Sequence, residues 1–301
     1  MKQITFAKQD ATFAGLSAFT VQPRKGGKDK TLRDTDWVDA RPSLVRQGIS
    51  KVRATIPNCL GEYEQSVLLG IVNLCGRVPM PERTFLKRSL PGNGEACEYR
   101  VMEIEATLGG ILKAARLASG TKAYARVKDA VRALGMVRVE YEVTEGNRTR
   151  LRSGEPLISY SIDLDADSPS EAVFRMWVSE RLSSVFLPVV DGVIPEYVLV
   201  DMDERAGLSG DVARILYVHL CFKVGASNAT SLTFRTDTLM RWLYAVPPRN
   251  SAEAADRRRE VRKAVEAIAA LGSSRIAVEW LDEDRNYLKV VDMRDGEGEG
   301  W

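Results

Sequence analysis

The chain has 301 residues, of which 45% are hydrophobic and 28% charged, with a formal net charge of +2. This length predicts two domains, and the apolar content suffices for two modest cores. The absence of any run of eighteen or more apolar residues excludes a membrane-spanning segment, and the N-terminal MKQITFAKQD lacks the apolar core of a signal peptide, so we expect a cytoplasmic protein.

The first half of the chain predicts a basic N-terminal arm over residues 1–49, mobile over 1–36, followed by a first domain over 50–165. Alternation predicts a strand at 50–57, and one apolar stripe predicts a helix at 62–75. Next come a strand and short helix over 101–117, then a helix that Thr121 caps and Gly135 ends. We expect a strand at 137–143, a turn with basic flanks at 145–156, and a returning strand at 157–164.

A polar stretch at 166–195 predicts a connector to a second domain over 196–294, and the tail is 295–301. The second domain predicts an amphipathic helix at 209–225, a short strand, and a helix that ends before Pro247 and Pro248. A long third helix, capped by Ser251 or Asp256, ends at Gly272, and a hairpin over 275–293 turns at 284–286.

The two predicted domains repeat the same order of three helices and a β-hairpin. The first helices share VNLC (72–75) and VHLC (218–221), and the third helices share VKDAVRA (127–133) and VRKAVEA (261–267). A pattern found twice is stronger evidence than either copy alone. The sequence therefore predicts an α+β protein with two tandem winged-helix domains related by internal duplication.

Both third helices predict an apolar face against the domain and a basic face opposite it. A helix that enters a DNA major groove needs this division, because the exposed face must meet phosphates and base edges. Wing arginines can reach the flanking backbone. The predicted DNA-binding residues are Lys122, Arg126, Lys128, Arg132, Arg148, Arg150, Arg152, Arg257, Arg258, Arg259, Arg262 and Lys263. The alternative is that the basic stripe is only a solvated helix face.

The stretches VARILYVHLC, SLTFRTDTLMRWLYAV and RRREVRKAVEAIAALG of the second half resemble plasmid replication initiators with two winged-helix domains, the Rep type. The likeness is greatest to the RepC initiator of IncQ-type plasmids and extends to the TrfA group. In the first half, residues 108–141 and 157–164 match less sharply. The acidic second wing, LDEDRN, and the long basic arm depart from the family pattern.

This resemblance implies a protein that binds direct repeats (iterons) in double-stranded origin DNA and promotes origin opening. It also implies self-association through the first winged-helix domain, partners such as the replicative helicase or other replication proteins, and no ATPase activity. A winged-helix transcriptional regulator of plasmid genes and a protein-binding module are the alternatives that the same domains allow.

The residues themselves favour a protein that is not an enzyme and holds no cofactor. The one histidine, His219, lies inside an amphipathic helix, which is typical of a packing residue. Cys59, Cys75, Cys97 and Cys221 lack the spacing of metal ligands, so we expect reduced thiols and no metal site. The segment RKGGKDKT lacks the spacing of a phosphate-binding loop.

Overall fold

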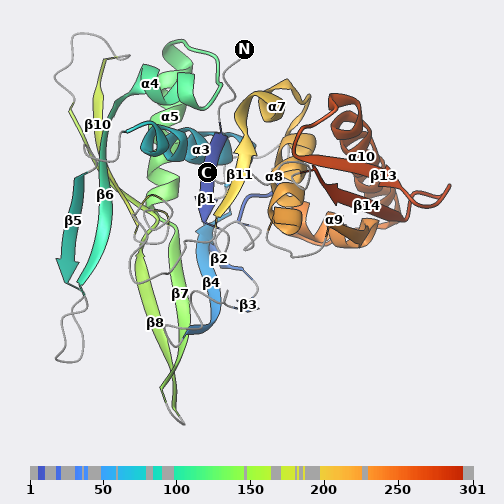
Figure 1. The fold of residues 1–301 in the computed structure, drawn as a ribbon, viewed down its shortest axis with the longest axis horizontal. Helices are drawn as coiled ribbons and strands as arrows, with labels where there is room; N and C mark the ends of the chain where they lie inside the picture. Colours follow the sequence, from blue (N-terminus) through green and yellow to red (C-terminus); the bar gives the residue numbers. More distant parts are fainter. Residues whose placement is uncertain are drawn as a thin grey trace.

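The computed structural model shows a mixed α+β chain with a group of helices in each half (Figure 1). It describes residues 6–10, 18–21, 31–35, 37–39, 49–58, 60–78, 84–89, 98–145, 148–163, 171–179, 182, 186, 197–225 and 230–293. The expected tail at 295–301, residues 24–30 of the basic arm, Cys59 and Cys97 lie outside these ranges. Among the described residues, no helix combines the length and the apolar character needed to cross a bilayer.

Three mutually packed helices build the first half: α3 (Glu62–Arg77), α4 (Leu108–Ala114) and α5 (Thr121–Gly135). Apolar residues of α3 such as Val67, Leu68 and Ile71 are fully buried, which confirms the predicted stripe. Gly70 brings α3 against the end of α4, because a Cβ at this position would lie 2.8 Å from the backbone nitrogen of Ala115. The predicted cap of α5 is wrong: Gly120 precedes the helix, and Thr121 is its first residue.

Two sheets flank these helices. β4 (Ile49–Pro57) lies between β7 (Arg138–Glu145) and the short strands β2 (Leu32–Asp34) and β3 (Val38–Asp39), and β7 pairs with β8 (Arg148–Pro156). The second sheet has the order β5-β6-β10-β9, with β5 at Thr84–Ser89, β6 at Glu98–Thr107, β10 at Val173–Val178 and β9 at Ile158–Ile162.

These pairings correct two sequence predictions. The strand that returns from β7 is β8, whereas β9, the expected returning strand, pairs with β10. The pairing of β7 with β8 is local, and the sequence pattern missed it because β8, RTRLRSGEP, lacks the alternation of apolar and polar residues that indicated β9. The stretch expected to be a connector, 166–195, contributes β10 to the interior of the second sheet, between β6 and β9.

The N-terminal segment also departs from the expectation of mobility. β1 (Phe6–Asp10) pairs in antiparallel fashion with β11 (Tyr197–Asp201), and Figure 1 shows this pair between the two groups of helices. Residues 18–20 are buried, and the backbone of this segment is bonded to both halves: Thr20 N donates to the Leu60 carbonyl, and Val21 N donates to the Leu243 carbonyl. The described parts of the arm therefore join the two halves.

The second half repeats the three-helix arrangement with α8 (Asp211–Gly225), α9 (Thr236–Leu243) and α10 (Ser251–Leu271), preceded by the short α7 (Met202–Gly207). Its sheet has the order β12-β14-β13, with β12 at Ser231–Arg235, β13 at Ile276–Trp280 and β14 at Tyr287–Asp292. A helix pair, a third helix and a terminal hairpin closed by one earlier strand form a winged helix, as predicted.

The ends of α10 are set by local hydrogen bonding. The predicted caps Ser251 and Asp256 are wrong, because the Asn250 side chain accepts a hydrogen bond from Glu253 N at 2.9 Å and Ser251 is the first helical residue. Gly272 ends the helix as predicted, with a φ of 61° in the left-handed region that favours glycine.

Candidate nucleic-acid interface

A concentration of basic side chains lies on α10. Its buried residues Val261, Ala264, Val265 and Ile268 pack into the second half, as the helical period predicts. Arg258, Arg259 and Lys263 are exposed on the remaining surface, and Arg262 is half-buried beside them. The helix is therefore anchored by one face and presents four cations on another.

Two of these arginines connect α10 to its neighbours. Arg258 Nη2 lies 3.3 Å from an oxygen of Asp237 in the first turn of α9, and Arg262 Nη2 donates to the Asp284 carbonyl at 2.5 Å in the turn of the wing. These contacts orient both guanidinium groups between α9 and the wing. The Arg258–Asp237 contact is an exposed ion pair, so a phosphate or a guanine edge can replace it at little cost.

Arg257 and Arg259 differ from this pair. Arg257 lies on the side of α10 that faces the loop after α9, where it bonds the Val246 carbonyl and Glu253, each at 2.5 Å, and lies over the Tyr244 ring. Its side chain is only 15% exposed, which indicates a structural contribution. Arg259 forms an exposed ion pair of 2.6 Å with Asp256 on its own helix.

The wing turn contains a basic residue that the sequence analysis missed. Arg285 lies in the turn between β13 and β14 with a φ of 56°, and it pairs with Glu266 of α10. Asp282 is used internally: although desolvation raises its pKa, hydrogen bonds from the N–H groups of Tyr287 and Asn286 hold the pKa below its ordinary value. The acidic composition of LDEDRN hid Arg285, since nothing in the sequence shows which charges are engaged within the turn.

On α5, the predicted residues lie around the surface that does not contact the core. Lys122, Arg126 and Arg132 are exposed and Lys128 is half-buried, whereas Val127, Val131 and Leu134 are buried. Arg126 lies over the Tyr63 ring of α3 at 3.7 Å, and Arg132 pairs with Asp129 at 3.5 Å. Within the described part of the chain, Lys122 and Lys128 form no ion pair.

Arg148, Arg150 and Arg152 occupy strand positions and not the turn expected for them. They lie on β8 opposite Glu145, Val143 and Tyr141 of β7. The β7–β8 hairpin projects away from the helices, as Figure 1 shows. The side chains of these three arginines lie outside the described part of the structure.

A groove of about 1090 Å³ lies between the two halves and is bordered by both third helices. Arg126 of α5 lines it from one side and Lys263 of α10 from the other. Acidic residues from α3, α8 and α10 also line it, so its charge is mixed: Glu62, Glu64, Asp211, Glu253, Asp256 and Glu260.

His219 is a packing residue, as the sequence indicates. It is 3% exposed on α8, and its ring lies 6.1 Å from the Trp242 ring of α9. Burial first and the nearby Lys223 second lower the pKa of His219 to about 4, so the ring is neutral at neutral pH.

Comparison with known proteins gives one family and a set of solved structures. The model of the family described as Replication protein C (RepC) matches residues 86–281, and no curated protein matches. Two crystal structures of domains 2 and 3 of RctB each give a TM-score of 0.51 at 11% identity, covering 94% and 93% of this chain and 98% and 96% of theirs. A structure of the Pi initiator protein with iteron DNA gives a TM-score of 0.47 at 13% identity, covering 97% of this chain and 99% of that one.

Proposed function

Because the chain belongs to the replication protein C (RepC) family, we infer that it is a plasmid replication initiator that binds double-stranded origin DNA through both winged-helix domains. The observation that carries the proposal is the surface of α10, where Arg258 and Arg262 are held between α9 and the wing. A rigid basic helix of this kind can enter a major groove while its arginines meet guanine edges and phosphates.

Each predicted basic group has its own part in this proposal. Arg258, Arg259, Arg262 and Lys263 contact one major groove, with Arg285 on the flanking backbone, and α5 contacts a second groove through the side chains of Lys122, Arg126, Lys128 and Arg132. The β8 arginines Arg148, Arg150 and Arg152, which belong to the same half as α5, extend the α5 contact along the phosphates. Arg257 contributes indirectly, by holding the start of α10 against the Val246 carbonyl.

Binding through this many cations makes affinity depend strongly on salt. If six to eight phosphates are neutralised, log K should fall against log salt with a slope of about −5 to −7. Fluorescence anisotropy with an origin fragment, repeated over a series of potassium chloride concentrations, measures this slope. An affinity that salt does not change, or no affinity for any origin fragment, would contradict the proposal.

Two unlike third helices in one chain predict an asymmetric site. We expect one monomer to protect about 20 bp, because successive major grooves on one side of the duplex are about 10 bp apart. Inserting 5 bp between the two parts turns them to opposite sides, and we expect affinity to fall about tenfold or more, because the two helices can then no longer bind together. A footprint over an inverted repeat, indifferent to which half is altered, would instead favour the transcriptional regulator.

We also propose that the chain acts without catalysis of its own, in the cytoplasm, and recruits a helicase or other replication proteins. In support, the one histidine, His219, is buried and packs against Trp242 of α9. Self-association through the first winged-helix domain belongs to the same proposal.

The purified protein should show no ATP turnover above background in a phosphate-release assay. Turnover that a point mutation in this chain abolishes would refute this part.

A further inference from the structure

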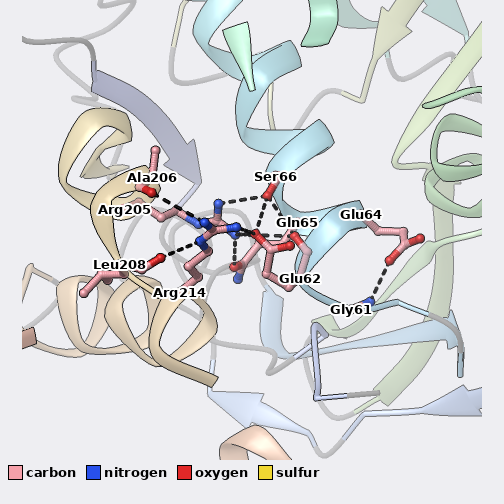
Figure 2. A network of polar contacts seen from close by, with 9 residues as sticks. All are labelled: Gly61, Glu62, Glu64, Gln65, Ser66, Arg205, Ala206, Leu208 and Arg214. Atoms are coloured by element: carbon pink, nitrogen blue, oxygen red, sulfur yellow. Dashed lines mark hydrogen bonds and ion pairs between the residues drawn. The ribbon is translucent and has the colours of Figure 1, made fainter. Parts of the chain in front are cut away.

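A buried polar network joins the two halves of the molecule. Figure 2 shows Arg205 of α7 directed at the start of α3, where Nη1 donates to Ser66 Oγ at 2.9 Å and Nη2 donates to Gln65 Oε1 at 3.0 Å. Nη2 also lies 3.2 Å from Glu62 Oε1, which Arg214 of α8 approaches at 3.3 Å. The Arg205 side chain is 3% exposed and that of Glu62 is 8% exposed.

The residues next to this contact continue it into both third helices. Beside Glu62, Tyr63 contacts α5: its hydroxyl donates to the Ala123 carbonyl at 3.3 Å, and Arg126 lies over its ring. Beside Arg205, Glu204 accepts hydrogen bonds from Ser273 at 2.5 Å and from Ser274 N at 2.7 Å, just after α10 ends. Two pairs of consecutive residues thus connect α5 with α10.

Stability alone does not explain a buried ion pair at this junction. Removing charges from water is costly, and apolar residues of similar volume often serve stability as well or better. The Arg205 guanidinium instead fixes the orientation of α7 relative to α3, because its planar donors can bond several acceptors at once in only one relative rotation of the two helices. Burial lowers the pKa of Arg205 to about 10, so the group stays charged at neutral pH.

We propose that Arg205 and Glu62 are positioning residues that set the spacing and rotational phase of α5 and α10 on the DNA. The inference rests on the proposed two-groove binding. The proposal gives the junction a role in specificity. The network fixes the distance between α5 and α10, so the protein selects DNA sites whose two contacted grooves have the matching spacing.

The test compares wild-type protein with Arg205→Met and Arg205→Lys on two duplexes, the natural site and the site with 5 bp inserted. Arg205→Lys keeps the charge but replaces the two donor nitrogens Nη1 and Nη2 with one ammonium. This variant is used for the comparison if Arg205→Met does not fold. We expect affinity for the natural site to fall about tenfold and the penalty of insertion to shrink to about threefold, because loosely joined halves have a lower effective concentration and adjust separately.

The matched control is Val265→Ala, which weakens the core of the second half away from the junction. It should keep the full wild-type penalty of insertion even though it lowers the melting temperature. A second readout needs no DNA: dyes at Met136 and Ala270, exposed near the ends of α5 and α10, report the distance between the halves by single-molecule energy transfer. We expect a broader distribution in the Arg205 variants and an unchanged one in Val265→Ala.

Folded Arg205 variants with the wild-type insertion penalty and distance distribution would overturn the positioning role while leaving DNA binding intact. If the wild-type protein binds the natural site without any insertion penalty, two-groove binding itself fails, and the positioning role fails with it. The measurements on the wild-type protein therefore distinguish a failure of the positioning role from a failure of two-groove binding.

Discussion

Removing Arg258 and Arg262 together is expected to weaken specific duplex binding by about 100-fold or more, since each good arginine contact to a base pair contributes about 1–3 kcal/mol. Both side chains lie on the surface of α10 between α9 and the wing. Neither belongs to the buried set of this helix, so the loss should come from the interface and not from the fold.

The experiment measures the affinity of Arg258→Ala, Arg262→Ala and the double variant for the specific site and for a scrambled duplex. The matched control is Arg175→Ala on β10, an exposed arginine that pairs with Glu103 and Glu105 on the other half's sheet. It should keep wild-type affinity. Circular dichroism and thermal melts of all variants should resemble wild type. Normal specific binding by the double variant would show that α10 does not contact the bases.

Acidification is expected to destabilise the protein through His219, by about 2 kcal/mol between pH 7.5 and pH 5. The folded pKa is about 4, below the ordinary value of 6.5, because burial and Lys223 disfavour the charged ring. Between these two values the unfolded chain binds more protons than the folded one. The stabilisation is therefore complete above about pH 6.5 and is lost as the pH falls toward 4.

The chain contains a single histidine, so this window is free of other imidazoles. Urea unfolding at half-unit steps from pH 7.5 to 5 measures the slope in the wild-type protein and in His219→Asn, which keeps a side-chain donor but has no group that titrates there. We expect the variant to be less stable at pH 7.5 but to have a flatter pH profile. Parallel profiles would mean that the His219 ring titrates normally in the folded state.

The three packed helices of each half and the final hairpin were predictable because their determinants are local. Apolar spacing in α3 and α10 and the left-handed Gly272 act within one or two turns of chain. The hairpin over β13 and β14 joins neighbouring segments, so a short turn signal sufficed. The duplicated order of these elements then indicated the winged-helix class, and the helical period identified the exposed basic residues of α5 and α10.

Long-range pairing decided the rest. The pairing of β4 with β7, the place of β10 between β6 and β9, and the pairing of β1 with β11 depend on contacts between distant segments, and an alternating pattern does not identify the partner strand. Arg205 and Glu62 are 143 residues apart, and a charged residue in either helix looks like any solvated one until the halves meet. The sequence by itself determined which helices carry the basic faces. The tertiary structure alone decided how those helices are joined, because an ion pair constrains the orientation of two helices only when both partners are buried away from water.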